Sequence, residues 1–215
     1  QRRGEYLTAV TALLVDDLTA MAQEWQASGQ QAASNKTLRS DFLATQPKAA
    51  LQRLLYGIGS IALGETASER MRVARISNSP EDEHDCFSDN THNSHYYNGQ
   101  GIPNVYTGTY RRVDGSLVTG PSLSDLVQQS DPELDARLNN QLDASMEALA
   151  LMKARAESSE NPMAFDTMIA PGNAEGTRIV NGAIMALVAQ TGSIEQAARD
   201  LGIEALSPDD AGHAF

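Results

Sequence analysis

The sequence of this 215-residue chain has few of the features that mark disulfide-stabilised, nucleic-acid-binding or membrane-spanning proteins. Its single cysteine, Cys86, rules out a disulfide within the chain, and cysteine usage does not indicate a redox compartment. The chain has only 16 Lys and Arg against 28 Asp and Glu, a formal net charge of −12. Because phosphate backbones and anionic lipid surfaces attract basic proteins, this balance excludes nucleic acid and favours a cationic ligand such as a metal ion.

Two further absences concern the location of the protein. No run approaches the roughly 18 consecutive apolar residues needed to cross a bilayer. The chain begins at Gln1 instead of an initiator methionine, and it lacks a charged and apolar leader. We therefore expect a processed or excised piece of a longer protein, in which a signal peptide could precede this segment.

The apolar residues, 41% of the chain, recur at helical spacing. One series forms a single helix face: Tyr6, Val10, Leu14, Leu18, Met21 and Trp25. Another begins after Pro47: Leu51, Leu54, Leu55, Ile58, Ile61 and Ala62. Nearby Gly57, Gly59 and Gly64 indicate either close approach of a neighbouring helix or a poorly optimised helix. The Gln/Ala/Ser/Asn stretch around Gly29 is typical of a connector.

The second half of the chain has clearer helix boundaries. Asp131 and Pro132 combine an N-cap acceptor with a proline at the first helical position, so they predict a helix that continues to about Glu157. A further buried helix is predicted over Ile179–Val188, and a short hairpin over Val105–Val118. We predict an all-α chain that folds as one domain, residues 1–215, with the helices packed as an antiparallel bundle.

Near the C-terminus, Gly192–Ile203 resembles the first helix and turn of a helix-turn-helix, with Ser193 and Gln196 as a capping box. The residues that follow contain no Lys or Arg and include Pro208, so no recognition helix is predicted. A short C-terminal helix packed on the bundle is the simpler interpretation.

The segment from Glu81 to His95 contains most of the candidate chemistry. It holds three of the four histidines, His84, His92 and His95, among five acidic residues: Glu81, Asp82, Glu83, Asp85 and Asp89. Imidazole and carboxylate together suit first-row metals such as iron, zinc or manganese. If the segment is helical, Glu81 shares a face with His84, and Asp85 and Asp89 share one with His92.

Other interpretations of this segment remain open. It could be a structural polar network at an interface or a solvated surface, since His-x-x-His alone is a weak signal. Cys86 could act as a nucleophile beside His84, or it could be a small buried hydrophobe. Upstream, the charged residues Glu65, Glu69, Arg70, Arg72 and Arg75 could orient ligands or form ordinary surface pairs.

Taken together, several motifs resemble one family. The string Glu81-Asp-Glu-His-Asp-Cys-Phe-Ser-Asp-Asn-Thr-His92 is followed by Asn98, Gly101-Ile102 and Asn104-Val-Tyr106, and preceded by Gly64-Glu-Thr-Ala-Ser-Glu-Arg-Met71. With Asp200-Leu-Gly-Ile203 near the end, these motifs resemble the C-terminal half of imelysin-like proteins, in particular the branch called iron-regulated protein A.

The resemblance implies a fold, a location and partners. Imelysin-like proteins are bacterial and periplasmic or outer-membrane-associated, often lipoproteins, and are linked to iron uptake. They have two helical bundles related by a pseudo-twofold, with the presumed site between them. By this resemblance the chain is the C-terminal bundle, its partners are the N-terminal bundle and iron-uptake components, and any membrane association requires an anchor outside this chain.

The resemblance also implies a site. The metal ligands would be Glu81, His84, Asp89 and His92, with Ser88, Asn90 and His95 as further site residues and iron or another divalent ion as the metal. The family is filed among metallopeptidases because of a Gly-x-His-x-x-Glu motif in its N-terminal half, which this chain lacks. We therefore expect metal or ligand binding in iron uptake, with metallopeptidase activity as the alternative and no catalytic residue assigned. As a third possibility, the His/Asp segment is a polar surface that contacts the N-terminal half and has only a structural role.

Overall fold

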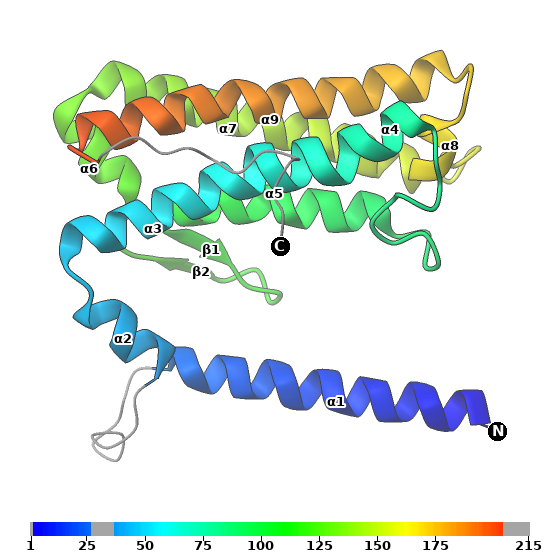
Figure 1. Ribbon diagram of the computed structural model, residues 1–215, viewed down its shortest axis with the longest axis horizontal. Coiled ribbons are helices and arrows are strands. Elements are labelled where there is room, and N and C mark those ends of the chain that lie inside the picture. The colour runs from blue at the N-terminus through cyan, green and yellow to red at the C-terminus, as the bar shows by residue number, and fades with distance from the viewer. Residues whose placement is uncertain (1, 27–36, 204–215) are drawn as a thin grey trace. The chain divides into compact units, whose positions relative to one another are not determined.

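Helices dominate the structure, as the sequence predicts. The computed structural model describes residues 2–26 and 37–203, and the chain is 75% helical with one two-stranded hairpin (Figure 1). It divides into two compact units, Gln1–Ala50 and Leu51–Phe215, which are described separately. Among the helices of these described ranges, none combines the length and the hydropathy that crossing a membrane requires. The connector predicted around Gly29 lies outside the described residues.

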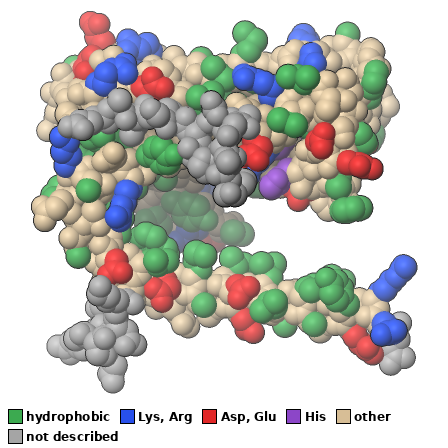
Figure 2. Space-filling view, viewed as in Figure 1, with side chains coloured by type: hydrophobic (Ala, Val, Ile, Leu, Met, Phe, Trp, Pro, Cys, Tyr) green, Lys and Arg blue, Asp and Glu red, His purple; other side chains and the backbone are tan. Residues whose placement is uncertain are grey.

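The first unit contains two helices that contact each other. Helix α1 (Arg2–Trp25) confirms the first predicted helix, and α2 (Leu38–Ala44) begins at a capping box between Thr37 and Ser40. The Glu24 carboxylate accepts a hydrogen bond of 2.9 Å from the Leu38 backbone N–H. No residue of α1 is buried, and its apolar face is exposed along the whole helix (Figure 2).

The second unit is the helical bundle, and it contains all of the candidate segment. Its elements in chain order are α3 (Pro47–Ser60), the π-helix η1 (Ile61–Arg72), α4 (Val73–Ser77), α5 (Thr91–Thr107), strands β1 (Thr109–Arg111) and β2 (Leu117–Thr119), α6 (Leu123–Ser130), α7 (Pro132–Ala156), α8 (Phe165–Ile169) and α9 (Ala174–Asp200). Helix α9 packs along α7 and η1, and α5 packs on α7. The antiparallel bundle is therefore confirmed.

Short-range sequence signals gave correct element starts in this unit. The Asp131 side chain accepts a hydrogen bond of 2.9 Å from the Leu134 N–H, and Pro132 is the first residue of α7. The predicted hairpin is present, with Thr109 opposite Thr119 in an antiparallel pair. In the core, the buried Tyr106 hydroxyl of α5 donates to the Asp135 carboxylate of α7 at 2.8 Å.

The C-terminal prediction was wrong in one respect. Within the described residues, up to 203, no separate short helix begins at Gly192, because α9 continues without a break from Ala174 to Asp200. Ser193 therefore lies inside the helix and is buried instead of capping a new one. Burial of Ile194 and Ala197 in the core explains this continuity, since tertiary packing outweighs the modest helix penalty of one glycine.

The helix after α3 has an unusual geometry. Residues Ile61–Arg72 form a π-helix, whose wider turn brings side chains five residues apart onto one face. Accordingly Glu65 pairs with Arg70 at 2.8 Å, not with a residue three or four positions away. The π-helix is rare and occurs mostly as single-turn bulges inside α-helices, so a run of this length is unusual.

Close contact with a neighbouring element is seen at Gly99 and Gly176 but not at Gly57. A Cβ on Gly57 would meet nothing within 4 Å, so this position does not reflect a neighbouring helix. A Cβ on Gly99 would lie 2.2 Å from the Leu149 side chain, and one on Gly176 would lie 2.3 Å from the Met168 Cα. Glycine is thus required where α9 meets the backbone of α8, whereas at Gly99 an added methyl group would displace the end of the Leu149 side chain.

Candidate functional site

The segment before α5 is not helical, so the predicted helical pairings were wrong. Residues 81–89 form turns, and Asn90 is the N-cap of α5. Asp89 has a left-handed backbone, φ 56°, and its N–H bonds back to the Asp85 carbonyl at 3.0 Å. The Thr91 hydroxyl accepts a hydrogen bond of 3.0 Å from the Asp85 N–H, which fixes the turn against the start of the helix.

This geometry divides the predicted site residues into two groups. Five are exposed: Glu81, His84, Ser88, Asp89 and Asn90. The other two, His92 and His95, are buried in α5 with 8% and 0% of their surfaces exposed. The rings of exposed His84 and buried His95 are nevertheless close, with centroids 6.4 Å apart. Cys86 is a free, half-buried thiol.

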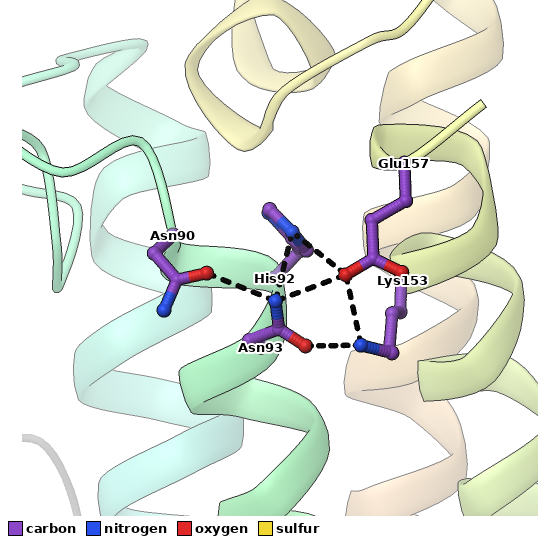
Figure 3. A network of polar contacts seen from close by, with 5 residues as sticks. All are labelled: Asn90, His92, Asn93, Lys153 and Glu157. Atoms are coloured by element: carbon purple, nitrogen blue, oxygen red, sulfur yellow. Dashed lines mark hydrogen bonds and ion pairs between the residues drawn. The ribbon is translucent and has the colours of Figure 1, made fainter. Parts of the chain in front are cut away.

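A polar network connects the start of α5 with the end of α7 (Figure 3). The Asn93 amide donates to the Asn90 side-chain oxygen at 2.9 Å and to the Glu157 carboxylate at 3.0 Å. The Lys153 ammonium donates to Glu157 at 2.8 Å and also to the Asn93 amide oxygen. His92 Nε2 lies 3.5 Å from the Glu157 carboxylate.

Sequence reasoning missed three members of this network, Asn93, Lys153 and Glu157. Asn93 lies within the predicted segment, but an asparagine between two histidines carries no metal-ligand signal. Lys153 and Glu157 are 60 and 64 residues away from it, and their spacing of four looks like an ordinary helix-surface pair. Only the packing of α5 on α7 brings them together.

Several buried polar atoms of this region have no hydrogen-bond partner in the described part of the chain. They include both ring nitrogens of His95, Nδ1 of His92 and one carboxylate oxygen of Glu83. Leaving such a group unsatisfied costs about 1–3 kcal/mol. Ordered water, an ion or a ligand could satisfy such groups.

Burial sets the protonation of two of these groups. Burial, together with weaker repulsion from His84, Arg70 and His92, lowers the pKa of His95 to about 3. The ring is therefore neutral near pH 7, the form in which imidazole binds metals. Burial raises the pKa of Glu83, and the carboxylates of Asp166, Asp89 and Asp85 add to this effect while a hydrogen bond with Thr91 opposes it.

An open pocket of about 610 Å³ lies beside α5. It is lined by His84, Asn90, Asn93, Ser94, Tyr97, Asn98 and Lys153. Of the predicted site residues, only His84 and Asn90 are part of this lining. We call this cavity the α5 pocket.

The donor types in this region fit a first-row metal, but only in part. His84 and His95 offer two imidazoles, and Glu83 offers a carboxylate oxygen without a partner. Within residues 2–26 and 37–203, however, no three His, Cys, Asp or Glu side chains are arranged to hold one ion. A metal held here would need further ligands from another molecule or from a change in the loop.

Comparison with known proteins identifies the family to which the chain belongs. A family model described as imelysin matches residues 1–194 of the chain. No curated protein matches the sequence.

Proposed function

The chain belongs to the imelysin family, and from this premise we propose that it is a component of bacterial iron uptake that binds iron, or a ligand that carries iron, at the α5 pocket. We propose a periplasmic or outer-membrane-associated location on the same basis. The observation that carries the proposal is the exposed His84 on the pocket lining, only 6.4 Å from the neutral ring of His95, whose nitrogens have no hydrogen-bond partner among the described residues.

We further propose that an N-terminal imelysin bundle is a partner of this chain. Two observations support this proposal. The described residues supply imidazoles but no set of three ligands, so a partner could complete the site. In the first unit, α1 exposes large apolar side chains such as Leu14 (57%) and Leu18 (59%), and a large exposed apolar face is typical of a protein interface.

Isothermal titration of the 215-residue chain with ferrous and ferric iron tests the metal proposal. We expect iron to bind, and the His84→Gln variant to bind at least about tenfold more weakly because a ring nitrogen is lost from the pocket. His84 is exposed, so this change should leave the fold intact, which circular dichroism can verify. The Asp114→Asn variant is the control, because Asp114 lies in the hairpin turn and not on the pocket lining.

Two results would contradict this proposal. One is the absence of binding of both free iron and ferric citrate by a correctly folded chain, and the other is equal binding by the wild type and His84→Gln. Cleavage of unfolded peptides that a chelator abolishes would instead support the alternative metallopeptidase activity, in which a metal activates the attacking water.

A further inference from the structure

We infer that the α5 pocket recognises an anionic, oxygen-rich small molecule of the carboxylate or hydroxycarboxylate class. This inference rests on the proposed function in one respect only, namely that the bound molecule would chelate iron. Recognition of the anion itself follows from the side chains that line the pocket.

The pocket lining consists mainly of polar side chains that can donate hydrogen bonds, of which Ser94 already donates to Asp85 and Asn93 to Asn90 and Glu157. Besides His84 it contains the amides of Asn90, Asn93 and Asn98, the hydroxyls of Ser94 and Tyr97, and the ammonium of Lys153. None of the described residues that line it is a carboxylate, although a site for a bare cation would be expected to present several. The exposed carboxylates of Glu81 and Asp89, predicted as ligands, are not part of the lining.

Asn98 provides the most specific indication of a ligand. Its side-chain nitrogen is buried and has no hydrogen-bond partner among the described residues. It follows Ser94 by four positions on α5, so both side chains lie on the same helix face and both line the pocket. A ligand oxygen at this position would remove the cost of the unsatisfied N–H.

Lys153 supplies a positive charge and one N–H group that is not used in the contacts with Glu157 and Asn93. An ammonium has three N–H groups, and contacts with Glu157 and Asn93 use two of them. The ammonium also lies 5.7 Å from the ring centroid of Tyr97 and 5.8 Å from that of Tyr96, which restricts its position. The third N–H can donate a charge-assisted hydrogen bond to a carboxylate.

The volume of the pocket suits a small molecule of this class, and salt screening limits the repulsion between the acidic chain and an anion. A volume of about 610 Å³ is far larger than a bare ion needs and falls in the range of small-molecule sites. The chain has a net charge of −12, which opposes an anion at long range. Salt screens charges beyond about 8–10 Å, so contacts within the pocket determine binding.

Titration of the iron-free chain with citrate tests this inference. We expect citrate to bind, and Asn98→Asp to weaken binding at least about tenfold, because a donor is replaced by a repelling carboxylate of the same shape. Lys153→Met should weaken binding similarly and make it less dependent on salt. Lys48→Met is the matched control, since Lys48 is an exposed lysine near the start of α3 that does not line the pocket.

The outcomes separate this inference from the proposed function. Binding of iron without any binding of citrate would overturn the inference and leave the proposed function standing. Citrate binding that Asn98→Asp removes would support the inference even if the chain binds no iron. Citrate binding that neither pocket variant changes, in folded protein, would also overturn it.

Discussion

His95 shows how a single residue of the candidate segment responds to its environment. Its ring is fully buried and meets the Phe165 ring edge to face, with centroids 5.1 Å apart. Burial keeps the ring neutral because it removes the hydration of the charged form, and neither ring nitrogen has a hydrogen-bond partner among the described residues. This residue therefore links the chemistry of the site to the stability of the fold.

We predict that His95 makes the fold sensitive to acid. Its pKa falls from 6.5 to about 3 on folding, so between these values the unfolded chain takes up a proton that the folded chain does not. Stability contributed by the neutral ring is complete above pH 6.5 and decreases as the pH falls toward 3, by about 1.4 kcal/mol per pH unit. Urea denaturation at several pH values should show that the free energy of unfolding of His95→Phe falls less steeply with decreasing pH than that of the wild type.

The control for this prediction is Phe165→Leu, which changes the same ring contact without removing a titratable group. We expect it to lower the free energy of unfolding by a similar amount at every pH. If the free energy of unfolding of His95→Phe falls with decreasing pH as steeply as that of the wild type, His95 does not cause the acid sensitivity.

At the scale of elements, the bundle depends on close contact at a few helix positions. Gly176 near the start of α9 faces the backbone of α8, and an added Cβ would lie 2.3 Å from the Met168 Cα and 2.4 Å from its carbonyl oxygen. Backbone atoms cannot rotate away as a side chain can. At Gly99, by contrast, the nearest atom is the end of the Leu149 side chain.

We predict that Gly176→Ala destabilises the chain by about 1–3 kcal/mol, because α8 and α9 must separate to accommodate the methyl group. In the same helix, Gly182 is exposed and an added Cβ meets nothing within 4 Å. Gly182→Ala should therefore stabilise the chain by up to about 1 kcal/mol through helix propensity. Urea midpoints of the two variants should move in opposite directions, and a shift in the same direction would contradict the prediction.

At the scale of the whole molecule, the main feature is the apolar face of α1. Tyr6, Leu7, Leu14 and Leu18 are all more than half exposed. Soluble proteins seldom leave so large a contiguous apolar face in water, because covering it recovers roughly 25 cal/mol per Å².

We predict that the isolated chain associates at micromolar concentration through this face. The double variant Leu14→Gln and Leu18→Gln should reduce association, while Thr8→Gln and Thr19→Gln, on other positions of the same exposed helix, should not. Sedimentation velocity over a range of concentrations measures the effect. A wild-type chain that stays monomeric throughout, or a leucine variant that associates equally, would contradict the prediction.

Much of the fold could be predicted from the sequence because its signals are local. Helical periodicity identified α1 and α7, the cap at Asp131 gave the start of α7, and a turn pattern gave the hairpin. These features depend on residues within a few positions of one another. Two of the predicted site residues, His84 and Asn90, line the α5 pocket, but the same reasoning assigned helical faces to a segment that forms turns.

The sequence by itself determined the fold class, the family motif and the local element boundaries of this protein. Only the tertiary structure determined that α9 continues past Gly192, that His95 is buried and that Lys153 and Asn98 line one pocket. The physical reason is that burial and long-range packing decide these features. Lys153 and Asn93 are separated by 60 residues, and no local pattern records that α7 packs on α5.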